Sequence, residues 1–123
     1  MDLNKLTVAQ ARKDLDAKKY SALDLTNAYL KQITEKNGEI HAYLEVWEES
    51  ARAEAKAADE RIARGESTPL LGIPVAMKDN ILIHGRHASS SSKILKNYVA
   101  SYDATVTKKL KAEGAVFLGR TNM

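Results

Sequence analysis

Two apolar runs without polar alternation, at residues 70–77 and 115–119, constrain this chain more than any other feature. Such runs are typical of strands buried on both faces, because a half-exposed strand alternates apolar and polar residues. Between them a helix is predicted at 104–113, with Asp103 as its N-cap and Gly114 at its end. Strand, helix and strand in this order predict a βαβ unit of an α/β fold, with parallel strands at 73–78 and 116–118.

The part of the chain before residue 67 is predicted to be helical. The three expected helices span about 8–18, 22–38 and 47–64. Thr7 and Ser21 have capping-box spacing to a polar residue three positions later, so they are the expected N-caps. Gly38 is the expected end of the second helix. The third helix has an alanine-rich face, which suits close packing against another element.

We divide the chain into an N-terminal helical segment, 1–66, and a second segment, 67–123, that contains the first strands and helix of the α/β core. A short hairpin or extended excursion is expected at 81–88, followed by a serine loop at 89–92. Two buried strands cannot both be covered by this much sequence. We therefore expect an incomplete domain that belongs to a larger sheet.

Composition excludes several classes of function. The net charge of +3 comes from 19 basic and 16 acidic residues that are interspersed, so no basic stripe indicates a nucleic-acid site. The absence of cysteine excludes disulfides, thiolate metal sites and cysteine nucleophiles within this stretch. No secretory signal and no apolar run of about 20 residues are visible. The expectation is a soluble, cytoplasmic protein.

Lys78 is the strongest candidate for a catalytic residue. It follows an apolar strand, and parallel sheets gather functional groups at the carboxyl ends of their strands. Burial there would favour the neutral amine, which can then act as a general base. Asp79 and Asn80 are suited to turning the chain and bonding nearby backbone. The alternative is a lysine that extends into solvent and pairs with Asp79.

Serine and histidine residues are weaker candidates. Residues 89–92 are four serines, but no glycine-rich turn that could form an oxyanion hole surrounds them, so a hydrogen-bonding polar loop is favoured. His84 and His87 lie three positions apart in an extended segment, and His41 is distant. Residues at that spacing point to opposite sides of an extended chain, so no metal site is expected.

An ordered series of sequence blocks in the second segment resembles the amidase signature family. The blocks are LGIPVAMKDN at 71–80, SKIL at 92–95, NY at 97–98, YDATV at 102–106, GA at 114–115 and GRTNM at 119–123. Within that family, the series looks most like the A subunits of glutamyl-tRNA(Gln)/aspartyl-tRNA(Asn) amidotransferases. The serines at 89–92 replace a more varied Thr/Cys/Ala/Gly stretch, and no functional role is carried over to them.

The resemblance implies an α/β/α fold with a large mixed sheet and a Ser–cis-Ser–Lys triad, in which Lys78 matches the catalytic lysine. Both family serines and their glycine-rich loop would lie downstream of Met123, so this segment alone is expected to be inactive. The resemblance implies no cofactor for this chain. It further implies glutamine as the ammonia source and a heterotrimer with B and C subunits. ATP, magnesium and most contacts to the misacylated tRNA would belong to the partner subunit.

Three functions follow as hypotheses. The first is the glutaminase subunit of a tRNA-dependent amidotransferase, which supplies ammonia to convert Glu-tRNA(Gln) or Asp-tRNA(Asn) to the amidated form. The second is a stand-alone amidase that acts on a small amide. The third is a non-catalytic split or binding fragment that requires a partner to supply the remaining strands.

Overall fold

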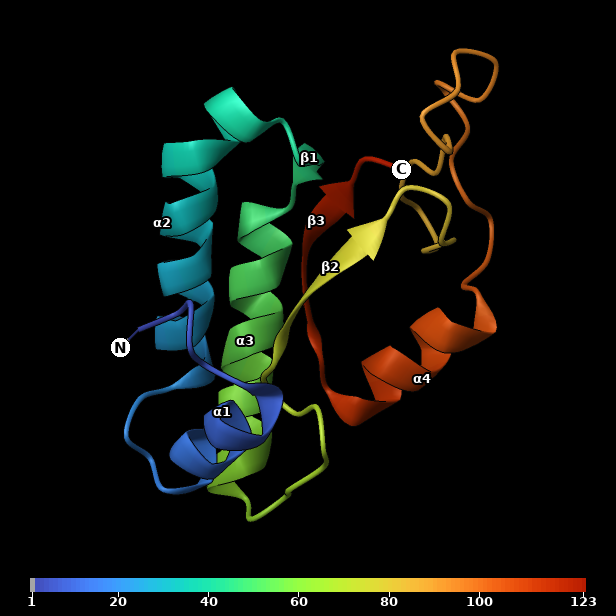
Figure 1. Ribbon diagram of the computed structural model, residues 1–123. Helices are drawn as coiled ribbons and strands as arrows, with labels where there is room; N and C mark the ends of the chain where they lie inside the picture. The colour runs from blue at the N-terminus through green and yellow to red at the C-terminus, as the bar shows by residue number, and fades with distance from the viewer. Residues whose placement is uncertain (1) are drawn as a thin grey trace.

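The computed structural model describes residues 2–123. The chain folds into three layers, with helices on both faces of a small sheet (Figure 1). The elements in chain order are α1 (Val8–Asp16), α2 (Ala22–Ile40), β1 (Tyr43–Val46), α3 (Glu48–Ala63), β2 (Pro74–Lys78), α4 (Thr105–Glu113) and β3 (Val116–Thr121). The strand order is β1-β3-β2, with β2 parallel and β1 antiparallel to β3. The predicted α/β class, the βαβ unit and the mixed sheet are confirmed.

The central strand β3 separates two apolar clusters. Val116 and Leu118 pack with α1, α2 and α3, whereas Phe117 packs on the opposite side with Leu110 of α4. Figure 1 shows the same division, with α1–α3 on one side of the sheet and α4 on the other. All four residues from 116 to 119 are buried. The prediction of a strand buried on both faces is therefore confirmed for β3.

The same prediction is wrong for β2 in the part of the chain that the structure describes. Met77 is buried, but Ala76 and Lys78 are exposed. The reason is the packing within residues 2–123, where Met77 lies in the cluster around Phe117 but Ala76 belongs to neither apolar cluster. The division at residue 66 stays a prediction, although α1–α3 and the sheet share one core.

Helix α3 packs closely through alanine. Ala51, Ala55 and Ala58 are buried on the face that meets α2 and β3. Asp59, on the same helix, accepts hydrogen bonds from the backbone N–H groups of Ala22 and Leu23 at 2.6 and 3.1 Å. It therefore satisfies donors that the first turn of α2 would otherwise leave unpaired. The expected close packing of the alanine face is confirmed.

The predicted N-caps are present, but the predicted end of α2 is wrong. Thr7 accepts from Gln10 N at 3.1 Å, and Ser21 forms a complete capping box with Asp24. Helix α2 continues through Gly38 to Ile40 and ends at His41, which has a left-handed φ of 56°. An interior glycine costs roughly 0.5–1 kcal/mol, which is too little to end a helix that is supported by packing.

Strand β1 was not predicted from the sequence. The Asn37 side chain binds Tyr43 on both backbone groups, accepting from its N–H at 2.8 Å and donating to its carbonyl at 3.1 Å. This contact leads the chain from α2 into the sheet, where β1 pairs with β3. The pairing partner lies far away in the sequence, so local patterns carry no sign of it.

Two further predictions are corrected. Of the short hairpin and the extended excursion expected at 81–88, the hairpin is wrong: the second part of this segment pairs with 98–100, through a bridge between His87 and Val99. The N-cap of α4 is Ala104, without a side-chain cap. Asp103 accepts instead from His84 N at 2.7 Å and pairs with Lys111 at 2.9 Å. Within residues 2–123 no helix has the length and apolarity that a bilayer crossing requires.

Candidate functional site

Lys78 is the last residue of β2 and lies opposite Thr121 of β3. The lysine is therefore at the carboxyl end of a parallel strand pair, as the sequence predicts. Its side chain is exposed, and no hydrogen bond or ion pair of its ammonium is found among residues 2–123. The expected burial of the amine is not present in this part of the protein, and the catalytic role of Lys78 stays a prediction.

The next residue, Asp79, carries a buried carboxylate that is 1% exposed. Oδ1 accepts from Ser89 N at 3.1 Å and from Arg120 Nη1 at 2.6 Å. Oδ2 accepts from Ser89 Oγ at 2.5 Å and from Ser91 N at 2.8 Å. A buried charge needs such partners, because removal from water without them is costly. Asp79 is thus paired with Arg120, whereas the sequence alternative paired it with Lys78.

The ionised form of Asp79 is favoured despite its burial. Burial by itself raises the pKa of this carboxyl, but the hydrogen bonds from Ser89, Ser91 and Arg120 outweigh it. Together they lower the pKa of Asp79 to about 2. The carboxylate therefore stays charged throughout the neutral range.

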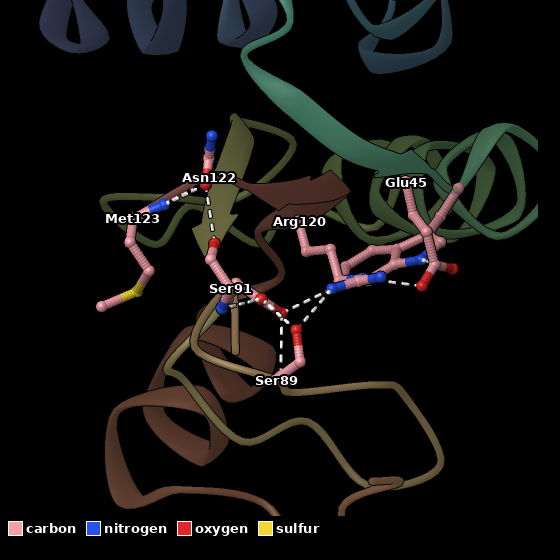
Figure 2. Close-up of polar contacts among 8 residues, drawn as sticks. Glu45, Ser89, Ser91, Arg120, Asn122 and Met123 are labelled. Carbon is pink, nitrogen blue, oxygen red and sulfur yellow. Dashed lines mark hydrogen bonds and ion pairs between the residues drawn. The ribbon is translucent and has the colours of Figure 1, made fainter. Parts of the chain in front are cut away.

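Arg120 extends the network across the sheet. Its Nε donates to Glu45 Oε1 of β1 at 2.6 Å, while Nη1 binds Asp79. Figure 2 shows the guanidinium between Glu45 on one side and Ser89 on the other. The Arg120 side chain is 14% exposed, so both ion pairs are partly shielded from solvent. One arginine therefore connects β1, β3 and the end of β2.

The serine loop forms the other side of this site. Ser89 is buried, and Ser90 and Ser91 have left-handed φ values of 49° and 54°. Serine adopts this conformation at a cost, which the bonds from Ser89 and Ser91 to Asp79 help to offset. Ser91 Oγ lies 2.6 Å from Asn122 Oδ1 at the end of β3 (Figure 2). The predicted hydrogen-bonding polar loop is confirmed.

The histidines lie outside this network. His84 is exposed and His87 bridges to Val99, while His41 caps α2. Within the described residues, no group of three or more His, Cys, Asp or Glu side chains is arranged to hold a metal ion. The candidate site thus consists of Lys78, Asp79, the serine loop and the end of β3, without the histidines.

Sequence reasoning gave Asp79 a turn-forming role or an ion pair with Lys78, and it did not single out Arg120 or Glu45. A partial signal was present, since Arg120 directly follows the buried run 116–119 and a buried arginine needs a carboxylate. The partner could not be chosen from sequence, because Arg120 lies 41 positions from Asp79 and 75 from Glu45.

Comparison with known proteins identifies the family. The Amidase family profile matches residues 24–123. The A subunit of glutamyl-tRNA(Gln) amidotransferase from Dehalococcoides mccartyi is 49% identical over 122 residues, which cover 99% of this chain and 25% of that protein. The corresponding protein from Brucella anthropi is 47% identical over the same coverage. The chain thus spans about a quarter of the length of these curated relatives.

A solved structure shows the same fold. The native peptide amidase from Stenotrophomonas maltophilia superposes with a TM-score of 0.91 at 30% identity, over 99% of this chain and 26% of that enzyme. The resemblance drawn from the sequence blocks is thereby confirmed, and so is the place of these strands and helices within the amidase fold. The chain belongs to the amidase family.

Proposed function

We propose that the protein containing this chain is the glutaminase subunit of a tRNA-dependent amidotransferase, with Lys78 as its catalytic base. The observation that carries the proposal is the place of Lys78 at the carboxyl end of β2, within a family whose signature block it matches. The high identity to the A subunits of glutamyl-tRNA(Gln) amidotransferases, over nearly the whole chain, supports the choice of substrate.

In the proposed reaction the neutral amine of Lys78 accepts a proton through a bridging serine. The nucleophilic serine then attacks the carboxamide carbon of glutamine, the proton held by Lys78 passes to the leaving nitrogen so that ammonia departs, and water hydrolyses the acyl-enzyme to glutamate. By the resemblance, both serines would belong to the part of the protein that follows this chain. Ammonia would pass to a B subunit that activates Glu-tRNA(Gln) or Asp-tRNA(Asn) with ATP and magnesium, and a C subunit would join the two.

Replacement of Lys78 tests the chemistry. In the full-length protein assembled with its partners, we expect Lys78→Ala to lower the kcat for glutamine hydrolysis roughly 10²–10⁴-fold, the usual contribution of a general base. Lys56→Ala, at an exposed position on α3, removes the same charge far from the site and should leave kcat unchanged. Wild-type turnover in the Lys78→Ala variant would reject the proposed base.

A stand-alone amidase is the second candidate, because a peptide amidase has the same fold over this part of its chain. Ammonia transfer to Glu-tRNA(Gln) in the presence of the B and C subunits distinguishes the two. Formation of Gln-tRNA(Gln) from glutamine supports the amidotransferase. Rapid hydrolysis of simple amides without any transfer supports the stand-alone enzyme.

A further inference from the structure

The buried carboxylate of Asp79 lies one peptide bond from Lys78. Its four hydrogen-bond donors come from two places, the serine loop and β3. The backbone of Asp79 is bonded as well, since its N–H donates to Thr121 O at 3.0 Å and its carbonyl accepts from Ser90 N at 3.2 Å. Side chain and backbone of this residue are therefore held at the same time.

This bonding fixes the peptide from which the Lys78 side chain departs. Lys78 itself is exposed, and among residues 2–123 no partner holds its ammonium. A lysine side chain has four rotatable bonds, so its Nζ can reach a defined place only if its backbone and its surroundings are rigid. Within the described residues, the rigid part on the backbone side is the Asp79 network.

The hydrogen-bond network around Asp79 also extends to β1, which adds to the rigidity of the Asp79 side chain. Arg120 is itself fixed by Glu45 at 2.6 Å, so the carboxylate of Asp79 is tied through one guanidinium to β1. The serine loop and β3 therefore bond directly to the residue that follows Lys78, and β1 is linked to it through Arg120. A shift in any one of them is opposed by the other two.

We propose that Asp79 is a positioning residue for the reaction, which holds the strand end so that the Lys78 amine meets its proton donor. This inference rests on the proposed function of Lys78. A general base must lie within about 2.6–3.2 Å of the heavy atom that carries the proton it accepts. A misplacement of about 1 Å can lower the rate roughly 100-fold. Asp79 acts through Lys78 and contacts no substrate in this scheme.

The test compares two carboxylate-to-amide variants of the full-length protein in its complex. Asp79→Asn keeps the shape of the side chain but removes the charge that pairs with Arg120. Asp14→Asn is the matched control, because Asp14 on α1 is 8% exposed and accepts from Gln10 at 2.8 Å and Tyr20 at 3.0 Å. We expect Asp79→Asn to lower kcat for glutamine roughly 100-fold with KM changed less than about threefold, and Asp14→Asn to leave both unchanged.

A combined variant separates positioning from general destabilisation. If Asp79 acts only through Lys78, Asp79→Asn should cost little further activity once Lys78→Ala is present, because residues that act as a unit are non-additive. Residual activity is measured with an activated ester. A full additional loss in the double variant, or a kcat near wild type for Asp79→Asn, overturns the inference while leaving the role of Lys78 intact.

Two further results keep the test decisive. If Asp79→Asn does not fold, Ser89→Ala takes its place, since it removes one donor to Oδ2 at 2.5 Å and keeps the ion pair. We expect kcat to fall roughly tenfold in that variant; an unchanged kcat overturns the inference. Wild-type activity of Lys78→Ala alone, by contrast, rejects the proposed function and with it the positioning role.

Discussion

Gly119 lies in β3 directly against the backbone of β1, opposite Val46. A Cβ atom at this position would overlap the carbonyl oxygen of Glu45 and lie 3.0 Å from Val46 Cα. Carbon atoms in contact are normally about 3.5–4.0 Å apart. The clashing atoms belong to backbone, which cannot rotate aside as the end of a side chain can. Gly119→Ala must therefore displace β1 or break its pairing.

The cost of this substitution follows from the contacts that would be strained. Overpacking alone typically costs about 1–3 kcal/mol. Displacement of β1 also weakens the hydrogen bonds from Trp47 N to Leu118 O at 2.8 Å and from Asn122 N to Ala42 O at 2.9 Å. Each contributes about 1 kcal/mol. We expect Gly119→Ala to lower the free energy of unfolding by about 3 kcal/mol or more.

Gly38→Ala is the matched control with the opposite expected sign. Gly38 lies inside α2, and a Cβ there would meet nothing within 4 Å. Alanine in a helix interior is favoured over glycine by roughly 0.5–1 kcal/mol, so this variant should be slightly more stable.

Denaturant unfolding of the full-length protein measures both changes, and hydrogen exchange locates them. In Gly119→Ala, protection should fall in peptides covering 42–47 and 116–123. A loss below about 1 kcal/mol with unchanged exchange in these peptides would refute the packing reasoning. Equal destabilisation by Gly38→Ala would refute it as well.

Two further predictions concern charge and packing. The pKa of Asp79 falls from 3.8 in the unfolded chain to about 2 in the fold, so its ionisation contributes about 2 kcal/mol of stability above pH 4 that is lost as pH falls towards 2. In Asp79→Asn the free energy of unfolding should therefore fall less steeply with decreasing pH over this range. An equal slope in the variant and the wild type would contradict this. Ala55→Leu should cost about 1–3 kcal/mol because Ala55 is fully buried, whereas Ala57→Leu, on the exposed face, should change stability by less than about 0.5 kcal/mol. Thermal unfolding of both variants checks that contrast, which equal losses would contradict.

Local patterns in the sequence were sufficient for most of the helices and for the βαβ unit. Ser21 and Asp24 form a cap within four residues, and the alanine face of α3 repeats at helical spacing. Such features depend on neighbours along the chain, so the sequence alone contains all the necessary information.

The predictions that proved wrong concern features that depend on contacts made only in the folded chain. Asp103 was expected to cap α4, but Lys111 and His84 N compete for its carboxylate, and their positions are known only once the chain has folded. Strand β1 exists because β3 offers it a free edge. Gly38 remains helical because its helix is packed, and this outweighs a local preference.

The candidate site combines both kinds of information. Lys78 was singled out from the sequence because it follows an apolar strand, and the resemblance to the amidase signature family gave it the role of catalytic base, which stays a prediction. Asp79 is its immediate neighbour, yet its proposed role depends on Arg120, whose guanidinium the sheet brings within 2.6 Å of both the Asp79 and the Glu45 carboxylates. A motif can therefore mark the residue that would perform the chemistry, while the side chains that fix its position are chosen by tertiary pairing.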